Sequence, residues 1–291
     1  MVDESARRRI KLALTNLDAL PAMPAIAQKL LALPLNTDEG ERQLLNLIEQ
    51  DPQISAKIIS LANSPIMGVS RRIGAVADAS MLLGLDRVKS VAIGIASMSN
   101  MAQLAPGENF KPQDLWLHSI TIAIVMRTIA QAMPAATRPR EDQIFLTGLL
   151  HDIGFMALHH IDDDASNELH LKLRRQPERP IPEVEMETLG ITHSVIGAQL
   201  AQHWNLPPEI AHAITYHHAP NQSESGAGDI LARLIHLAEK LEPNFGIAEH
   251  TGEPISDDDW LNLGIDPSEA EEIINLADEL AMQTAQASDT F

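Results

Sequence analysis

Hydrophobic residues recur every three or four positions along most of the chain, as in LLNLIEQDPQISAKIISLANS at residues 44–64. This spacing places the apolar side chains on one face of an α-helix. Alternating runs rich in Val, Thr, Tyr and Phe, which are typical of β-strands, are missing from the sequence. We therefore predict an all-α fold.

Residues that favour helix ends punctuate this pattern. Asp51 followed by Pro52 predicts an N-cap with proline in the first turn, and the NSP stretch at 63–65 predicts the end of the same helix. Gly84 predicts the end of a second helix, and Asp86 is placed to cap the next one. Local signals therefore define a helix between residues 51 and 63 and a helix boundary near residue 84.

A loop-forming stretch divides the chain. LAPGENFKPQD at 104–114 concentrates Pro, Gly and Asn between two periodic blocks, and RRQPERPIPE at 174–183 interrupts the second block. The acidic tail keeps a helical apolar stripe in SEAEEIINLADELAMQ, so we predict folded structure to about residue 285. The predicted organisation is an N-terminal helical subdomain at 1–105, packed on a second helical subdomain at 106–291 that includes a C-terminal helical extension.

The apolar run FLTGLLHDIGFMALHH at 145–160 contains His151 and Asp152 side by side. Taking two titratable side chains out of water is unfavourable unless they are hydrogen-bonded, paired or bound to a metal. The pair therefore predicts polar partners from elsewhere in the chain.

Candidate partners lie on the apolar faces of other predicted helices. His118, for example, lies three residues after Leu115 and four before Ile122, so it faces inward. A single inward histidine is usually a core residue bonded to a backbone carbonyl, but five of them with two carboxylates favour a polar centre, either a metal site or the remnant of one. The full set is His118, His151, Asp152, His193, His217, His218 and Glu239. The remaining histidines show no consistent inward placement, and we predict surface or packing roles for His159, His160, His170, His203, His212, His236 and His250.

Composition narrows the chemistry. The chain of 291 residues has 40 acidic and 21 basic residues and a formal net charge of -19, which argues against nucleic acid or an anionic membrane as partner. It has no cysteine, so any metal must be held by nitrogen and oxygen ligands. The N-terminus lacks a signal-peptide pattern, and no window reaches the roughly 18 uncharged apolar residues of a membrane span. We expect a cytoplasmic protein.

The order of these residues resembles the HD superfamily of metal-dependent phosphohydrolases, which use a helix histidine, an adjacent His-Asp pair and a later carboxylate. The matching positions are His118, His151 with Asp152, and Glu239. TGLLHDIG, then THSVIGAQLAQHWNLPPEI and AITYHHAP, is similar to the branch that contains the HD-GYP cyclic-di-GMP phosphodiesterases and the HDOD signalling domains. That resemblance implies that His193, His217 and His218 complete a site for two or three metals.

The first half of the chain favours the second of these relatives. LPAMPAIAQKLLAL, LIEQDPQISAKIISLANSPIMG and VADASMLLGLDRVKSVAIGIA resemble the HDOD domain, and the likeness extends from about residue 17 to 240. It implies a multi-helix HDOD fold whose second subdomain is HD-like. It also implies a bacterial signal-transduction module that acts through contacts with signalling proteins, including those of the cyclic-di-GMP network. The implied cofactor is one or two divalent metal ions, with Fe, Mn, Zn and Ni as candidates.

Three departures from the HD-GYP pattern bear on catalysis. Phe155 stands where those enzymes have a phosphate-holding lysine, the GYP loop is absent after HHAP, and Glu239 replaces their final aspartate. We therefore expect a metal-binding centre with impaired catalysis. The alternatives are an active phosphohydrolase for a cyclic dinucleotide or another phosphoester, with His151 and Asp152 as catalytic residues, and an HD-type di-iron oxygenase.

The expected geometry follows from the inward placement of these residues. We predict that the side chains of His118, His151, Asp152 and Glu239 converge on one centre. His193, His217 and His218 are expected to line its mouth.

Overall fold

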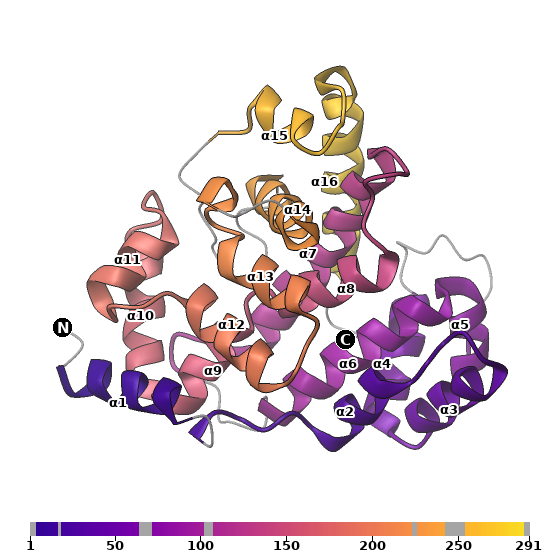
Figure 1. Cartoon of the computed structure of the whole chain (residues 1–291), viewed down its shortest axis with the longest axis horizontal. Coiled ribbons are helices and arrows are strands. Elements are labelled where there is room, and N and C mark those ends of the chain that lie inside the picture. Colours follow the sequence, from indigo (N-terminus) through magenta and orange to yellow (C-terminus); the bar gives the residue numbers. More distant parts are fainter. Residues whose placement is uncertain are drawn as a thin grey trace.

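The computed structural model describes residues 4–16, 19–63, 72–101, 107–222, 226–241 and 254–287. Every regular element in those ranges is helical, which confirms the predicted all-α fold (Figure 1). The first six helices are α1 (Glu4–Thr15), α2 (Ala25–Ala32), α3 (Asp38–Glu49), α4 (Pro52–Ala62), α5 (Val76–Leu83) and α6 (Leu85–Met101). The middle of the chain forms α7 (Pro112–Ala132), α8 (Glu141–Leu150), α9 (Ile153–Ile161), α10 (Asp163–Arg175) and α11 (Ile181–Thr188). The remainder forms α12 (His193–His203), α13 (Pro208–Tyr216), η3 (Pro220–Gln222), α14 (Ala227–Leu241), α15 (Asp257–Leu261), η4 (Pro267–Glu269) and α16 (Ala270–Ala287).

The predicted ends of α4 are confirmed. The Asp51 carboxylate accepts hydrogen bonds from the backbone N–H groups of Gln53 at 2.9 Å and Ile54 at 3.1 Å. These bonds satisfy two of the N–H groups that lack a partner inside the first turn of a helix. Asn63 follows the last helical residue as the C-cap, and residues 64 and 65 of the predicted NSP stop lie outside the described residues.

Gly84 ends α5 as predicted, with a φ of 87° that favours glycine. The prediction that Asp86 caps the next helix is wrong. The carbonyl of Gly84 accepts the first helical hydrogen bond, from the N–H of Val88, so Gly84 itself takes the cap position. Asp86 lies inside the first turn of α6, where its negative charge is favourable at the positive end of the helix dipole.

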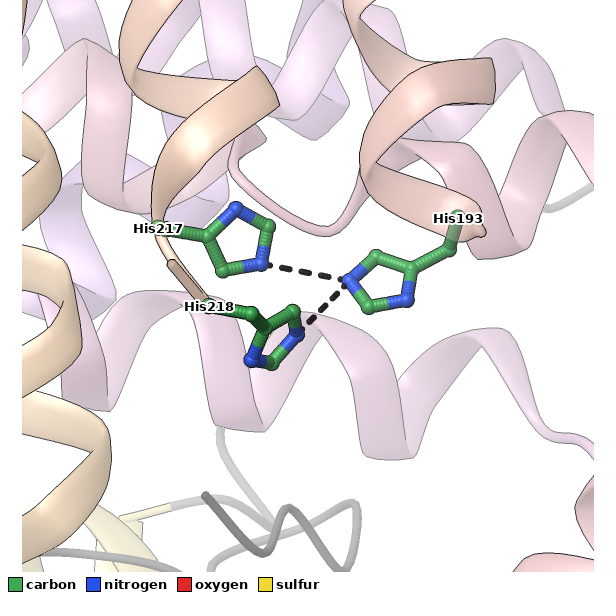
Figure 2. Close-up of side chains that lie close together, drawn as sticks. All are labelled: His193, His217 and His218. Atoms are coloured by element: carbon green, nitrogen blue, oxygen red, sulfur yellow. Dashed lines mark hydrogen bonds between the residues drawn. The ribbon is translucent and has the colours of Figure 1, made fainter. Parts of the chain in front are cut away.

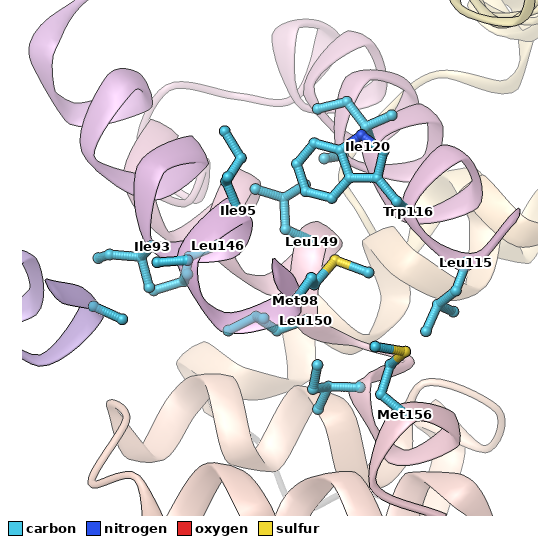
Figure 3. Packing of buried hydrophobic residues seen from close by; sticks show 14 of the residues in the cluster. Ile93, Ile95, Met98, Leu115, Trp116, Ile120, Leu146, Leu149, Leu150 and Met156 are labelled. Atoms are coloured by element: carbon cyan, nitrogen blue, oxygen red, sulfur yellow. The ribbon is translucent and has the colours of Figure 1, made fainter. Parts of the chain in front are cut away.

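One apolar core joins the N-terminal helices to the middle of the chain. In Figure 3, Ile95 and Met98 of α6 lie beside Trp116 and Ile120 of α7 and Leu149 of α8, and all five belong to the same buried cluster. The two predicted subdomains therefore share a core across α6, α7 and α8. Their boundary, predicted at residue 105, lies outside the described residues and stays a prediction.

A second apolar core packs the C-terminal extension onto the rest. It includes Ile129 of α7, Ile235 of α14, Trp260 of α15 and Ile273 of α16. The helix α16 reaches Ala287, close to the predicted end of folded structure near residue 285. In Figure 1, α15 lies at the top of the view, and α16 runs from there down beside α7, which it contacts.

The first helix, α1, lies against α9 and not with α2 to α6 (Figure 1). Arg9 Nε donates to Asp162 Oδ2 at 2.7 Å, at the junction of α9 and α10. Arg7 Nε donates to the carbonyl of Thr188 at 3.1 Å, at the end of α11. These two arginines attach the start of the chain to the part that begins at residue 106.

Two helical stretches, Pro112–Ala132 and Glu141–Ile161, are long and apolar enough to cross a membrane by length and composition. In the fold, 78% and 89% of their apolar windows are buried. This is the ordinary position of core helices in a globular protein.

Candidate metal centre

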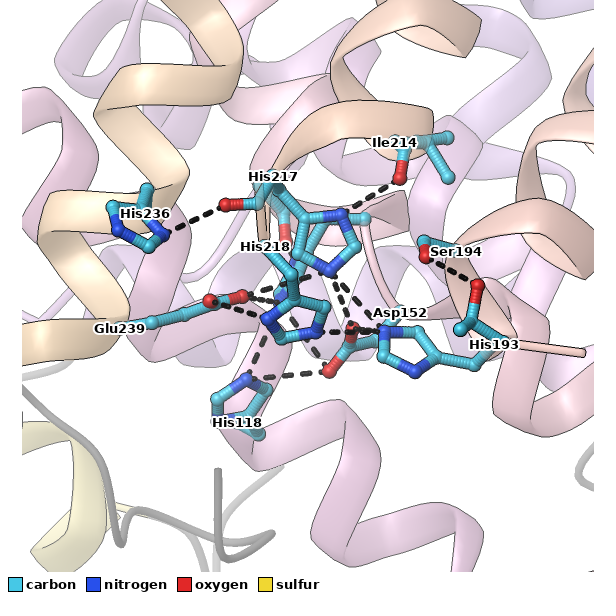
Figure 4. A network of polar contacts seen from close by, with 12 residues as sticks. His118, Asp152, His193, Ser194, Ile214, His217, His218, His236 and Glu239 are labelled. Atoms are coloured by element: carbon cyan, nitrogen blue, oxygen red, sulfur yellow. Dashed lines mark hydrogen bonds and ion pairs between the residues drawn. The ribbon is translucent and has the colours of Figure 1, made fainter. Parts of the chain in front are cut away.

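The residues predicted to face a common centre meet in the structure, as Figure 4 shows for most of them. They come from α7, the junction of α8 and α9, the start of α12, the end of α13, and α14. All but one of their side chains are 0% exposed, and His218 keeps 6% exposure. The set is His118, His151, Asp152, His193, His217, His218 and Glu239. Their convergence is confirmed, and their binding of a metal stays a prediction.

Two glycines allow the helices to approach closely enough for this convergence. A Cβ on Gly148 of α8 would lie 2.6 Å from Cα of Ala123 in α7, and a Cβ on Gly154 of α9 would lie 1.9 Å from the carbonyl oxygen of His193 in α12. Because a side chain at either position would overlap backbone atoms, only glycine fits. The first contact brings the α8–α9 junction close to His118, and the second brings it close to His193.

One half of the centre is formed by His118, His151 and one oxygen of Asp152. The Nε2 atoms of His118 and His151 lie 3.3 Å apart. Asp152 Oδ2 lies 3.4 Å from His118 Nε2 and 3.3 Å from His151 Nε2. Three ligand atoms therefore surround one point.

The other half is formed by three histidines and the second oxygen of Asp152. His193 Nε2 lies 3.2 Å from the Nε2 atoms of both His217 and His218 (Figure 2). Asp152 Oδ1 lies 3.2 Å from His193 Nε2 and 3.6 Å from His217 Nε2. Each oxygen of Asp152 thus faces a different set of imidazoles, which is the arrangement of a carboxylate that bridges two positions.

Glu239 also spans the two halves. Its Oε1 lies 3.5 Å from His151 Nε2 and 3.8 Å from His217 Nε2, and its Oε2 lies 3.6 Å from His218 Nδ1. The longer side chain of glutamate therefore reaches the position that the family resemblance assigns to a carboxylate ligand.

The hydrogen bonds behind three of the rings assign their tautomers. His151 Nδ1 lies 2.7 Å from the carbonyl of Gly148, and His217 Nδ1 lies 2.7 Å from the carbonyl of Ile214. A carbonyl oxygen can only accept, so both Nδ1 atoms carry the proton. His193 Nδ1 lies 2.9 Å from a carboxylate oxygen and is assigned the same way. In the neutral rings, every one of these Nε2 atoms has a lone pair that points into the centre.

Neutral Nε2 atoms that face each other cannot form a hydrogen bond, because neither has a proton to donate. His193 and His217 are in this situation at 3.2 Å. The contact is repulsive unless a cation or an added proton lies between the nitrogens. Both buried oxygens of Asp152 likewise have no hydrogen-bond partner of normal geometry among the described residues.

The spacing fits a divalent metal. Metal–nitrogen bonds of about 2.1 Å place neighbouring ligand nitrogens roughly 3.0–3.4 Å apart in octahedral or tetrahedral geometry. The Nε2–Nε2 separations here are 3.2 and 3.3 Å, and the ligand atoms of three overlapping groups lie within 4.8 Å of one another. Imidazole and carboxylate ligands without thiolate suit Fe, Mn, Zn or Ni.

Three groups in the centre favour their charged forms. Burial acts to raise the pKa of Asp152, but His151 and His193 stabilise its carboxylate and lower that pKa well below its ordinary value. Burial acts to lower the pKa of His193, but the charges of Glu185 and Asp152 raise it well above its ordinary value. The pKa of His151 is also raised, because Asp152 and Glu239 outweigh the effect of burial. The carboxylates therefore attract positive charge into the centre.

Two other histidines resist protonation. Burial, followed by the positive charge of His193, lowers the pKa of His217 well below its ordinary value. Burial, followed by the charges of His217 and His193, does the same to the pKa of His218. These rings stay neutral at physiological pH, which is the form that binds a metal.

The prediction that three histidines line the mouth of the centre is wrong. The side chains of His193 and His217 are 0% exposed, and together with His218 they form the second half of the same buried cluster. The sequence placed them on inner helix faces but contained no information on how deeply those faces are covered.

The sequence predicts no inward placement for seven further histidines, but three of them are buried, so for these three the prediction is wrong. His159 and His170 pack against Phe110, with ring centroids at 5.2 and 4.6 Å, so the predicted packing role holds for them. His236 Nδ1 donates to the carbonyl of His217 at 2.9 Å and so supports the centre from α14. His160 is exposed, and His203 and His212 are half-buried. His250, for which the same surface or packing role is predicted, lies outside the described residues.

Phe155 belongs to the wall of the centre. Its buried ring stacks on His193, with centroids 4.1 Å apart and planes at 23°. An apolar ring therefore covers one face of a candidate ligand at the position where the resemblance predicts a lysine.

Sequence reasoning missed Glu185. This carboxylate is buried, and its Oε1 accepts hydrogen bonds from both the backbone N–H and Nδ1–H of His193. A signal was present, because Ile181, Val184, Glu185 and Thr188 are spaced as one face of a helix, and all four are buried. Burial raises the pKa of Glu185, although His193 opposes that shift.

Comparison with known proteins identifies the family to which this arrangement belongs. A model of the HDOD domain matches residues 20–220. Over 214 residues, which are 72% of this chain, the sequence is 26% identical to an uncharacterized protein of Treponema pallidum (strain Nichols), of which the chain spans 40%.

Solved structures share the fold. A candidate signal transduction protein from Marinobacter aquaeolei VT8 matches 99% of this chain and 66% of its own, with a TM-score of 0.79 and 26% identity. An HDOD domain protein with unknown function from Geobacter sulfurreducens matches 95% of this chain and 98% of its own, with a TM-score of 0.70 and 22% identity. A candidate phosphohydrolase from Shewanella amazonensis SB2B matches 97% of both chains, with a TM-score of 0.67 and 22% identity. This chain thus spans less than the full length of its Treponema and Marinobacter relatives.

Proposed function

The chain belongs to the HDOD domain family, and we propose that it is a bacterial signal-transduction module whose HD-like centre binds two divalent metal ions without efficient turnover. At the coarser level, it is an HD-like module of the regulatory or phosphohydrolase kind. The proposal selects the regulatory function and assigns the centre a structural or sensory role.

One observation carries the metal-binding part of the proposal: imidazole Nε2 atoms face each other around a bridging carboxylate, so a cation, either a metal ion or an added proton, must lie between them. His193 and His217 meet at 3.2 Å with both Nδ1 protons already donated elsewhere, and Asp152 directs one oxygen to each half of the centre. His118, His151 and Asp152 Oδ2 would hold one ion. His193, His217, His218 and Asp152 Oδ1 would hold the other, with Glu239 near both.

Bound divalent ions would supply Lewis-acid chemistry, since they polarise phosphoryl oxygens and lower the pKa of water. Phosphoryl transfer also needs donors that stabilise the moving negative charge, and losing one typically costs about 3 to 4 kcal/mol, a few hundredfold in rate. Phe155 offers no such donor, because its buried ring lies against His193. The net charge of -19 adds no attraction for a phosphodiester. These features support regulation in preference to hydrolysis.

The partners proposed for this module are signalling proteins, including those of the cyclic-di-GMP network, in the bacterial cytoplasm. Support comes from the HDOD family and from the Marinobacter relative, which is named as a candidate signal transduction protein. The centre is buried next to the shared core. Ligand binding there would therefore act on the packing of α7, α9 and α12.

Metal analysis tests the binding part. Protein purified without chelator and without an affinity nickel column should contain two equivalents of Fe, Mn, Zn or Ni per chain. Elemental analysis of the double variant His151→Ala, Asp152→Ala should find none. Wild-type protein that contains no metal, and takes up none on dialysis against Mn²⁺, would contradict this part.

Hydrolysis tests the choice between the two functions. The alternative is a metal-dependent phosphohydrolase, which the complete ligand set and the name of the Shewanella relative support. We expect Mn²⁺-loaded or Fe²⁺-loaded protein to hydrolyse cyclic-di-GMP no faster than the same double variant. Hydrolysis of this or another phosphodiester well above the variant, by protein of known metal content, would overturn the regulatory proposal in favour of the enzyme.

A further inference from the structure

The buried carboxylate of Glu185, on α11, lies directly behind His193. We propose that Glu185 is a positioning residue, which holds His193 in its ligand orientation and thereby determines whether the second metal position is filled. This position is the one formed by His193, His217, His218 and Asp152 Oδ1. The inference rests on the metal binding proposed above and adds the residue that controls one half of it.

The contacts of Glu185 are directed at one residue. Its Oε1 accepts from the backbone N–H of His193 at 2.9 Å and from Nδ1–H of the same residue at 2.9 Å. His193 is the first residue of α12, and its N–H has no acceptor within the helix. One carboxylate oxygen therefore fixes both the backbone and the ring of this histidine.

The other two histidines whose tautomers are assigned do not need such a positioning residue. His151 and His217 are the C-caps of α8 and α13, and each ring donates to the carbonyl three residues earlier, on Gly148 and Ile214. A histidine at the end of a helix can thus be oriented by its own preceding turn. His193 stands at the start of a helix, where no preceding helical turn offers a carbonyl. Its orientation must come from elsewhere in the fold.

The cost of burying Glu185 supports a specific role. The side chain is fully buried, and its Oε2 has no hydrogen-bond partner in the part of the chain that the structure describes. An aliphatic residue on this inner face of α11 would avoid the loss of hydration that a carboxylate suffers. What an aliphatic residue could not supply is the two hydrogen bonds that the carboxylate accepts from His193. A carboxylate that accepts from Nδ1–H also makes Nε2 a stronger ligand, and losing such a partner typically weakens metal binding about 10- to 100-fold.

The test compares variants of Glu185 by metal content and by Co²⁺ absorption. We expect two equivalents of Co²⁺ in wild-type protein and one in Glu185→Ala, with the same count in His193→Ala. Glu185→Gln keeps an oxygen acceptor and removes the charge. It should bind the second Co²⁺ at least about 10-fold more weakly than wild type does, with a changed d–d spectrum.

Glu183→Gln is the matched control, because this residue lies on the same helix with 63% of its side chain exposed. It should bind two equivalents with wild-type affinity. A Glu185→Ala protein that binds two equivalents as tightly as wild type would overturn the positioning role and leave the proposed function intact. Wild-type protein that binds no metal would instead contradict the proposed function. If Glu185→Ala does not fold by circular dichroism, Glu185→Gln decides, and wild-type affinity in that variant would also overturn the role.

Discussion

The apolar core around α4 and the histidine–carboxylate centre are buried to the same degree but are built from opposite chemistry. Ile58 of α4 and Asp152 of the centre are both 0% exposed. Burial of the Ile58 side chain stabilises the fold, because removing apolar surface from water contributes about 25 cal/mol per Å² to the free energy of unfolding. Asp152 loses its hydration and gains no normal hydrogen bond among the described residues. The apolar core is therefore a source of stability, whereas burying the centre costs stability unless a cation compensates for the lost hydration.

The largest effect expected in the centre is the loss of metal in Asp152→Asn. Because the two carboxylate oxygens face different halves, one substitution weakens both positions, and the amide offers a weaker ligand without negative charge. We expect the metal content to fall from two equivalents to none after dialysis, as measured by elemental analysis. Asp164→Asn, at an exposed position on α10, should keep both. Retention of two equivalents by Asp152→Asn would show that the buried carboxylate is not a ligand shared by the two halves.

The corresponding change in the apolar core is Ile58→Ala. Removing a fully buried aliphatic side chain should lower the free energy of unfolding by about 2 to 5 kcal/mol, through lost burial and the cavity left behind. Urea denaturation measures this loss. The folded variant should still contain two equivalents of metal, since α4 contributes no ligand. Metal loss in a folded Ile58→Ala protein would mean that the two regions are not separable.

Gly154→Ala tests whether the centre depends on close backbone contact. The added Cβ would lie 1.9 Å from the carbonyl of His193, so α9 and α12 must separate. We expect a loss of about 3 kcal/mol in the free energy of unfolding, together with weaker binding of the second metal. In the control Gly74→Ala, the Cβ has no neighbouring atom within 4 Å. That variant should change stability by no more than about 0.5 kcal/mol in the same denaturation experiment.

The effect expected last, because it develops only on acidification, concerns His170, whose buried ring packs against Phe110 and against Phe155 in the wall of the centre. Burial lowers the pKa of His170 to about 4, so the folded protein keeps the ring neutral. The unfolded chain binds that proton near pH 6.5, and the contribution of His170 to stability is therefore full above this pH and is lost as the pH falls towards 4. One unit of pKa difference corresponds to about 1.4 kcal/mol, so the free energy of unfolding falls by roughly 3 kcal/mol by pH 4.

Denaturation of metal-free protein between pH 7 and 4 checks this sign. The free energy of unfolding of the wild type should fall more steeply with acidification than that of His170→Leu. The difference between the two proteins should grow gradually and reach roughly 3 kcal/mol near pH 4. Parallel curves would show that His170 is not held neutral by burial.

Predictions from the sequence succeeded where neighbours in the chain decide the outcome. Asp51 caps α4 because its side chain reaches N–H groups two and three residues ahead. The inward faces of His118, His193 and Glu239 followed from helical spacing. The prediction for Asp86 failed at the same local level, because the glycine two residues before it already holds the cap position.

Predictions failed where the partner comes from another helix. His236 was assigned no inward role, yet its ring donates to the carbonyl of His217 from α14. Glu185 was overlooked although its helix face was readable, because a buried carboxylate has meaning only beside the residue it contacts. Spacing along the chain cannot supply that information.

The order of residues alone therefore decided that the chain is helical, where several helices end, and which titratable side chains point inward. These properties depend on the 3.6-residue period and on atoms within a few positions of each other. Only the packed structure decided that Asp152 faces two sets of imidazoles, that His193 is deep in the centre, and that Glu185 orients it. The physical reason is that distances between helices are set by contacts such as Gly154 against His193, which join positions far apart in the chain.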